Sequence, residues 1–502
     1  GYFMKNILEY LEKSAQQYFT KVAFTDENHE MTYGSCVECS KKIGTALLEL
    51  KAKRKPIAVL MDKNVESLTG FFGVVYSGNF YVVIDCYMPK DRIEKIFETL
   101  KPIALITDYA HQELALSLHH KVYFYEDLMT TKINQVALDQ IRNQMIDTDP
   151  LYALFTSGST GVPKGAVVSH RNVINYASWY KDTFDINEET QFGSQTPFYF
   201  SMSVSDVFST IISGATLHIL PKKLFSFPIK LIEYMNEKKV NTIYWVPSAL
   251  CIIANLKVLD YLALEYVNKV LFAGEVMPTK QLNYWIKKIP DAMYANLFGP
   301  TETTDICTYY IVDREFKDDE VLPIGKACNN CDVFLLDENN QEVTDHSEGE
   351  LCVRGSFLAL GYYNNEEKTK EAFMQNPLNQ AYPEIIYRTG DLVKYNEFDE
   401  LIYITRKDFQ IKHMGYRIEL GEIEAAVNAL EKIQACAVIF DEGKDKIVLI
   451  YTGKMNDQEI MDGIKNKIPS YMYPNVIIKK KIMPYNQNGK IDRKWLKNHY
   501  ED

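Results

Sequence analysis

The hydrophobic pattern of the first 320 residues alternates between short apolar runs and longer segments with helical periodicity. Such alternation predicts βαβ units with parallel sheets, and ligands then bind beyond the carboxyl ends of the strands. The apolar runs that predict strands cover residues 56–61, 81–84, 103–107, 121–125, 215–220, 242–246 and 269–272.

The pattern changes after about residue 320. Short runs at residues 333–336, 350–353 and 401–405, with turn signals close by, predict a β-rich subdomain. Towards the end of the chain a helical segment at residues 421–430 is followed by strand-like runs at 435–440 and 446–452. We therefore expect an α/β protein with a large N-terminal domain of parallel α/β sheets, a β-rich subdomain, and a small mobile α+β C-terminal domain.

Length, composition and charge narrow the functional classes. A chain of 502 residues is too long for one ordinary core and indicates at least two domains. Its 46% hydrophobic and 24% charged residues are typical of a globular protein. The net charge of −12 argues against a nucleic-acid-binding surface. No apolar run approaches the ~20 residues that span a bilayer, so no membrane span is expected.

The start of the chain and its cysteines predict a cytoplasmic location. No signal peptide is recognisable, because the residues after Met4 indicate an amphipathic helix. The nine cysteines are odd in number and lack paired metal-type spacing, which fits free thiols in a reducing compartment. Cys328 and Cys331 form a CxxC pair, but no second pair accompanies them, so we do not expect a zinc site.

The most informative segment is residues 154–165, with the sequence LFTSGSTGVPKG. It combines four hydroxyls, three glycines and Lys164 directly after a strand-like run. Glycines let backbone N–H groups turn towards an anion, and hydroxyls and a lysine add further donors. The segment is not a Walker loop, because Pro163 stands five residues after Gly158 and Gly165 follows the lysine. It predicts a phosphate-binding loop, and a solvated glycine-rich turn is the alternative.

Several motifs in a fixed order show that the chain resembles the adenylate-forming superfamily. This superfamily includes acyl-CoA synthetases, luciferase-like enzymes and the adenylation domains that load carrier proteins. In character the chain is most similar to stand-alone amino-acid adenylation domains and D-alanine–carrier-protein ligases. The phosphate loop and the segments at residues 78–92, 296–304, 349–351, 361–362, 387–392, 406–424 and 488–492 carry the resemblance, which covers nearly the whole chain.

The resemblance implies a site for ATP and Mg²⁺. Phe298 would stack on adenine beside Asn296, although core packing is an ordinary role for a phenylalanine. Asp391 and Arg406 would hold the ribose, with a surface ion pair as the alternative. Glu302 would ligate Mg²⁺, which prefers carboxylate oxygen, or else serve as a charge at a helix start. The implied nucleotide-binding residues are Thr156, Ser157, Gly158, Ser159, Thr160, Gly161, Lys164, Asn296, Leu297, Phe298, Gly299, Thr301, Asp391, Arg406 and Lys490.

Lys490 follows an Asn-Gly turn near the end of the chain, where a lysine is usually just solvated. The resemblance implies that Lys490 bridges the substrate carboxylate and the nucleotide, with Thr156 and Lys164 as further catalytic residues. It also implies a large domain at residues 1–405, a hinge at 406–408 with Asp408 as the hinge residue, and a small domain at 409–502. Rotation of the small domain would gate two half-reactions and bring the Gly415 loop to the incoming thiol.

The segment at residues 196–208 resembles the family's substrate-binding segment, in which an aspartate pairs with an α-ammonium group. Here Ser201 stands in that place, and an unpaired buried ammonium would be costly. Asp305 puts a carboxylate elsewhere in the implied pocket. It could pair with a displaced amine, as in a β-amino acid, or serve another polar group of an amine-free acid, or be solvated. The pocket residues implied are Phe200, Ser201, Met202, Ser205, Tyr244, Leu271, Ala273, Gly274, Leu297, Asp305 and Ile306.

The function implied by the resemblance is ATP-dependent activation of a small carboxylic or amino acid as an acyl-adenylate, with release of pyrophosphate. Transfer to the phosphopantetheine thiol of an acyl carrier protein would follow. Free coenzyme A as acceptor and a non-catalytic nucleotide-binding scaffold are the alternatives.

Overall fold

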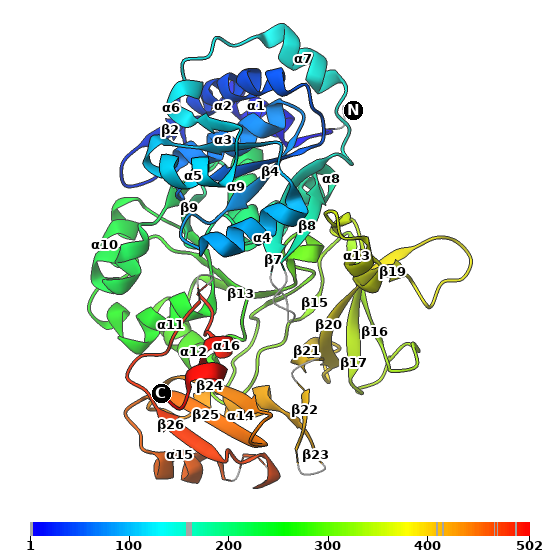
Figure 1. The fold of residues 1–502 in the computed structure, drawn as a ribbon. Helices are drawn as coiled ribbons and strands as arrows, with labels where there is room; N and C mark the ends of the chain where they lie inside the picture. Colours follow the sequence, from blue (N-terminus) through cyan, green and yellow to red (C-terminus); the bar gives the residue numbers. More distant parts are fainter. Residues whose placement is uncertain are drawn as a thin grey trace.

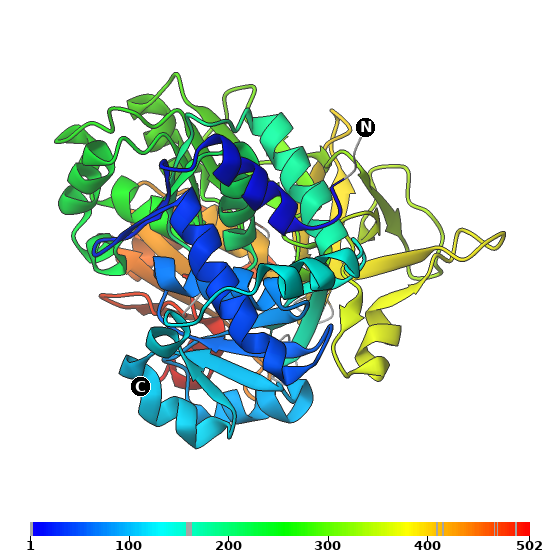
Figure 2. The same cartoon turned by 90° about the horizontal axis from the view of Figure 1, so that it is seen from above.

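The computed structural model describes residues 4–156, 163–407, 410–413, 416–465, 467–468, 470–486 and 489–502. Two large sheets face each other across a layer of helices, with a β-rich part to one side and a C-terminal unit (residues 410–502) below them (Figures 1 and 2). One hydrophobic core joins the two large sheets and the helices between them. The predicted fold class is confirmed.

The first large sheet has the order β18-β8-β7-β4-β3-β5-β6 among the described residues. Strands β7, β4, β3, β5 and β6 run parallel, whereas β8 and β18 are antiparallel additions. Their bounds are β3 (Pro56–Leu60), β4 (Phe80–Ile84), β5 (Ala104–Thr107), β6 (Val122–Phe124), β7 (Pro150–Thr156), β8 (Lys164–Ser169) and β18 (Gly361–Tyr362).

The second large sheet has the order β15-β14-β13-β12-β11-β9-β10-β1-β2 in the described part of the chain. Strands β13 to β1 of this order are parallel, and both edges carry antiparallel strands. Their bounds are β1 (Val22–Thr25), β2 (Glu30–Thr32), β9 (Gln191–Ser194), β10 (Thr216–Ile219), β11 (Thr242–Trp245), β12 (Lys269–Phe272), β13 (Met293–Phe298), β14 (Thr308–Ile311) and β15 (Lys326–Ala327).

The helices that pack between and around these sheets follow from their apolar faces. Helix α3 is apolar almost all round and nearly all buried, as a central helix must be. Gly73 of α3 lies so close to α2 that an added Cβ would stand 2.4 Å from Ile43. The bounds are α1 (Ile7–Gln17), α2 (Tyr33–Leu47), α3 (Val65–Tyr76), α4 (Lys90–Leu100), α5 (Gln112–Leu118), α6 (Tyr125–Leu128), α7 (Gln135–Asn143), α8 (His170–Phe184), α9 (Met202–Ser213), α10 (Pro228–Glu237), α11 (Pro247–Asn255) and α12 (Thr279–Lys288).

The β-rich part is an antiparallel sheet with a small core of its own around Leu351, Val393 and Leu401. Its elements are β16 (Cys331–Leu336), β17 (Gly349–Gly355), α13 (Glu366–Ala372), β19 (Phe373–Gln375), β20 (Ile385–Tyr395) and β21 (Leu401–Arg406). Short 3₁₀ turns elsewhere are η1 (Leu48–Leu50), η2 (Tyr109–His111), η3 (Lys222–Ser226), η4 (Val258–Asp260), η5 (Thr301–Thr303) and η6 (Ser470–Met472).

The C-terminal unit packs its central sheet between helices, and its two hydrophobic clusters contain residues of this unit alone. Helix α14 starts at Leu420 and ends at Asn428, slightly before the predicted end at residue 430. Its elements are β22 (Gln410–His413), β23 (Tyr416–Glu419), α14 (Leu420–Asn428), β24 (Ile433–Asp441), β25 (Lys446–Gly453), α15 (Asp457–Ile464), β26 (Val476–Lys479) and α16 (Arg493–His499). None of the described helices combines the length and apolarity needed to cross a membrane.

Candidate active site

Strands β7 and β8 form a hairpin that brackets the predicted phosphate loop. Thr156 ends β7, Lys164 begins β8, and the two residues lie opposite each other in the antiparallel register. The Nζ atom of Lys164 lies 4.8 Å from the centre of the Tyr362 ring in β18. The hairpin thus brings Thr156 and Lys164 together at one end of the sheet. Ser157, Gly158, Ser159, Thr160 and Gly161 lie outside the described residues.

Glu302 lies beside the same hairpin, in the turn η5. Its side chain is buried, and its Oε2 atom accepts a hydrogen bond of 2.9 Å from the Tyr387 hydroxyl. Burial, and secondly the charge of Glu302, raise the pKa of Tyr387 well above its usual range, so this tyrosine remains a donor. The carboxylate, an oxygen ligand of the kind that Mg²⁺ prefers, therefore has a fixed orientation. The sequence interpretation gave no role to Tyr362 or Tyr387, although both stand in quoted motifs.

The residues predicted to hold the ribose meet across the β20–β21 hairpin. Asp391 and Arg406 lie opposite each other, and Arg406 Nη1 is 3.4 Å from Asp391 Oδ1 and 2.6 Å from the Thr389 carbonyl oxygen. Gly390 makes this possible, because a Cβ there would stand 2.7 Å from Arg406 Nη2. Asp391 is only 6% exposed. The contact is therefore a half-buried pair rather than the surface ion pair considered from sequence.

Phe298 and Asn296 lie at the end of β13, next to this hairpin. The Phe298 ring is tilted against Tyr403 of β21, with 5.4 Å between ring centres. The Asn296 amide donates to the Pro323 carbonyl oxygen at 2.9 Å, so this donor is already engaged with the main chain. Leu297 is buried, and Gly299 packs against Ile306 so closely that an added Cβ would stand 2.3 Å from its Cα. Thr301 is buried at the start of η5.

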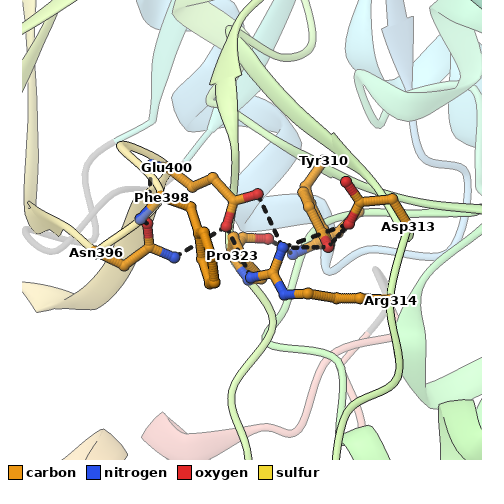
Figure 3. A network of polar contacts seen from close by, with 8 residues as sticks. Tyr310, Asp313, Arg314, Pro323, Asn396, Phe398 and Glu400 are labelled. Atoms are coloured by element: carbon orange, nitrogen blue, oxygen red, sulfur yellow. Dashed lines mark hydrogen bonds and ion pairs between the residues drawn. The ribbon is translucent and has the colours of Figure 1, made fainter.

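A polar network fastens the β-rich part to the end of β14 near these residues (Figure 3). The Arg314 guanidinium donates to both Glu400 carboxylate oxygens, at 2.8 and 3.2 Å, and lies 4.4 Å from the centre of the Phe398 ring. Asn396 donates to Glu400 at 2.9 Å. The bond from Arg314 holds the pKa of Glu400 below its usual range. Since Glu400 directly precedes β21, this fork fixes the strand that ends in Arg406.

Lys490 enters the large domain from the C-terminal unit. Its Nζ atom lies 5.3 Å from the centre of the Phe200 ring. Gly274 lies beside the lysine stem, because a Cβ there would stand in van der Waals contact, at 3.6 Å, with both Lys490 Cε and Met202 Sδ. Burial lowers the pKa of Lys490, opposed by the charge of Glu275. Lys490 is therefore not the solvated lysine considered from sequence, and Glu275 is a neighbour that sequence reasoning missed.

Beyond Phe200 lies a buried cluster around Asp305. The Asp305 Oδ2 atom accepts hydrogen bonds from the hydroxyls of Tyr176 at 2.5 Å and Tyr244 at 2.8 Å, and Ser201 Oγ lies 3.4 Å from Oδ1. Burial raises the pKa of Asp305 to about 7, and these hydroxyls oppose the increase. The suggestion that Asp305 is solvated is wrong, because its side chain is only 1% exposed. Tyr176 of α8 was missed, since it lies far from every quoted motif.

The other predicted pocket residues surround this cluster. Met202 and Ser205 lie on the first turns of α9, and the Ser205 hydroxyl donates to the Met202 carbonyl oxygen at 2.9 Å. Leu271 lies near the end of β12, followed by Ala273, and both are buried. Ile306 is buried directly after Asp305. The predicted pocket residues thus follow the carboxyl ends of β9, β11, β12 and β13, where ligands bind in parallel sheets.

Three side chains of α11 and α12 hold the C-terminal unit in this position. Ser248 donates to the Gly489 carbonyl oxygen, and Asn255 donates to that of Gln434 at 3.1 Å. Lys280 Nζ donates to three main-chain oxygens, those of Leu430, Glu431 (3.1 Å) and Ile433 (2.7 Å). The predicted hinge residue Asp408 and the Gly415 loop lie outside the described residues.

Comparisons with known proteins identify the family that this chain matches and proteins that it resembles. A family profile described as AMP-binding enzyme matches residues 11–363. The D-alanine--D-alanyl carrier protein ligase of Lacticaseibacillus casei is 29% identical over 508 residues, which are 98% of each chain. Tyrocidine synthase 1 of Brevibacillus parabrevis is 30% identical over 501 residues. This chain spans 45% of that protein and 9% of bacitracin synthase 1 of Bacillus licheniformis, to which it is also 30% identical.

Solved structures share the whole fold. The anthranilate CoA ligase AuaEII in complex with anthranoyl-AMP superposes with a TM-score of 0.86 at 20% identity, covering 98% of this chain and 96% of that one. A four-domain nonribosomal peptide synthetase bound to AMP and glycine gives a TM-score of 0.85 at 24% identity, covering 97% of this chain and 36% of that one. At these identities the likeness establishes the fold alone.

Proposed function

Because the chain belongs to the family of AMP-binding enzymes, we propose that it is an AMP-forming ligase that activates a small carboxylic acid and transfers it to a thiol. In the first half-reaction a carboxylate oxygen of the acid bonds to the α-phosphorus of ATP, the bond to the β-phosphate breaks, and pyrophosphate leaves. In the second, a thiolate attacks the acyl carbon and AMP leaves. The thiol proton passes to solvent.

One observation carries this proposal: Lys490 reaches from the C-terminal unit to the ring of Phe200, at the mouth of the candidate acid pocket. The two reactants of the first half-reaction are both negative, so their approach needs a cation at the point of attack. The half-buried ammonium of Lys490, at the Phe200 ring, would supply that charge. The lowered pKa of Lys490 reflects the desolvation that makes its charge effective.

The remaining roles are those that the resemblance to adenylate-forming enzymes implies. Thr156 and Lys164 would hold the outer phosphates, together with Ser157, Gly158, Ser159, Thr160 and Gly161. Glu302 would hold Mg²⁺, which when bound neutralises phosphate charge. Phe298 would stack on the adenine, and Asp391 with Arg406 would hold the ribose.

The acceptor that we propose is the phosphopantetheine thiol of an acyl carrier protein. Support comes from the carrier protein ligase of Lacticaseibacillus casei, which this chain matches over 98% of its length. Free coenzyme A is the competing acceptor. For the thiol step the C-terminal unit would rotate about Asp408 and present the Gly415 loop instead of Lys490.

Acid-dependent ATP–pyrophosphate exchange tests the first half-reaction. We expect exchange that depends on Mg²⁺ and on one added acid from a panel of carboxylic and amino acids. Lack of exchange with every acid, while ATP still binds, would favour a nucleotide-binding scaffold instead. Loading of a phosphopantetheinylated carrier protein, compared with thioester formation on free coenzyme A, identifies the acceptor.

A further inference from the structure

The carboxylate of Asp305 is held in the acid pocket by a strained turn. The preceding residue, Thr304, has φ 74° and ψ −58°, and Asp305 N donates to the Thr303 carbonyl oxygen at 2.9 Å, which together define a γ-turn. A β-branched residue in this conformation is strained by roughly 1–3 kcal/mol. Such strain persists where the surrounding structure fixes it, and here it directs the Asp305 side chain inward.

The hydrogen bonds of Asp305 are unevenly divided between its two oxygens. Both tyrosine hydroxyls donate to Oδ2, at 2.5 and 2.8 Å. Among the described residues, Oδ1 has only the longer 3.4 Å contact with Ser201 Oγ. Carboxylate oxygens each accept two hydrogen bonds, so Oδ1 retains capacity for a strong donor beside Ser201.

Two buried carboxylates lie in this region, and they differ in whether a cation lies close to them. A second buried carboxylate, Asp206 of α9, lies near Lys63, and their attraction opposes the desolvation of that lysine. Asp305 has no such cation: among the described side chains, no lysine, arginine or histidine contacts it. A buried carboxylate without a cationic partner is unfavourable unless it is protonated or a ligand supplies the charge.

We propose that the activated acid is an amino acid whose ammonium group binds Asp305 Oδ1 beside Ser201 Oγ. This inference rests on the proposed function and names its substrate class. An ammonium group has three hydrogen-bond donors and one positive charge. It could therefore donate to Asp305 Oδ1 and supply the cation that the Asp305 carboxylate lacks among the described residues. The Lys490 side chain lies at Phe200, next to Ser201 in the chain, and would face the carboxylate of the acid.

Because Ser201 Oγ lies 3.4 Å from Asp305 Oδ1, the negative charge can be moved by mutation from residue 305 to residue 201. A carboxylate placed at residue 201 would project into nearly the same space from the facing wall. Asp305→Asn keeps the shape and an acceptor for both tyrosines but removes the charge. Ser201→Asp combined with Asp305→Asn restores a carboxylate at the same ligand from the other side.

The test is ATP–pyrophosphate exchange with small amino acids, including alanine and β-alanine, each compared with its hydroxy and des-amino counterpart, such as lactate and propionate. We expect the best amino acid to exceed its counterparts in kcat/KM. Asp305→Asn should lower kcat/KM for that amino acid by about 10- to 100-fold, with little change for the counterparts or in the KM for ATP. The double variant should recover a large part of the loss.

Three results would overturn the inference. Preference of the unaltered enzyme for hydroxy or des-amino acids would show that no ammonium is bound. An equal loss for both acid classes in Asp305→Asn, with no recovery in the double variant, would assign Asp305 a purely structural role. Either result leaves acid-dependent exchange, and hence the proposed function, intact. Absence of exchange with any acid would instead remove the proposed function and this inference with it.

Discussion

Replacing Lys280 by methionine should weaken the docking of the C-terminal unit on the large domain. Methionine keeps the apolar stem but removes the ammonium that donates to the carbonyl oxygens of Leu430, Glu431 and Ile433. A hydrogen bond from a charged donor contributes about 1.5–3 kcal/mol. Lys280 is half-buried, and in the variant water can bind the three carbonyl oxygens. We therefore expect the loss of all three hydrogen bonds to cost about 2–3 kcal/mol in the free energy of docking. The equilibrium constant for docking should then fall by about 30- to 150-fold.

Two assays separate this effect from general damage. In the proposed reaction, pyrophosphate exchange needs Lys490 in its docked position, whereas thioester formation from pre-made acyl-adenylate needs the unit to have rotated. Lys280→Met should therefore slow exchange and leave thioester formation unchanged or faster. Lys287→Met is the matched control, since this lysine is an exposed residue of the same helix. Equal exchange rates in the two variants would refute the role assigned to Lys280.

Further predictions concern three residues of the site. Lys490→Ala should abolish acyl-adenylate formation while ATP still binds, measured by exchange and by equilibrium binding; a near-normal exchange rate would contradict the assigned role. Glu302→Gln should raise the Mg²⁺ concentration needed for half-maximal exchange, and an unchanged requirement would make Glu302 structural. Asp305 has a pKa of about 7 when folded against 3.8 as its ordinary value, so the folded state loses stability as pH rises between these values. Without ligand, the Asp305→Asn variant should therefore be more stable than the unaltered protein above pH 7, by up to about 4 kcal/mol in the free energy of unfolding. This gain should vanish near pH 4. Thermal unfolding at a series of pH values measures it, and a difference that does not change with pH would argue against the prediction.

Sequence reasoning succeeded where contacts are local or lie within motifs. The apolar runs predicted β3 to β6 of the first large sheet and β10, β11 and β12 of the second, because buried strands read as continuous apolar segments. They did not predict β1, β9 and β13. Thr156 and Lys164 lie opposite each other, because a hairpin brings its two ends together, and their role in binding phosphate stays a prediction. The partial burial of Lys490 could not be predicted from the residues adjacent to it in the sequence, because Phe200, which it contacts, lies 290 residues earlier.

The missed residues share a physical reason. Tyr176 was not predicted because a tyrosine on a buried helix face looks like core, and only the fold brings its hydroxyl to Asp305. Lys280 was not predicted because its partners are main-chain oxygens, which leave no mark in the sequence. Glu275 was not predicted because its effect is electrostatic: its charge raises the pKa of Lys490, a residue far away in the sequence.

The contacts that seat the C-terminal unit have a consequence for how interchangeable that unit is. In the described residues, Ser248, Asn255 and Lys280 all donate to main-chain oxygens of the unit and to none of its side chains. Every amino acid has the same main-chain carbonyl group. Substitutions in the contacted segments therefore leave these hydrogen bonds intact as long as the backbone conformation is kept. A C-terminal unit from a distant relative should therefore keep these three contacts, and the side chains it must also retain are those that meet the large domain directly, Lys490 at Phe200 and Arg493 near Glu275.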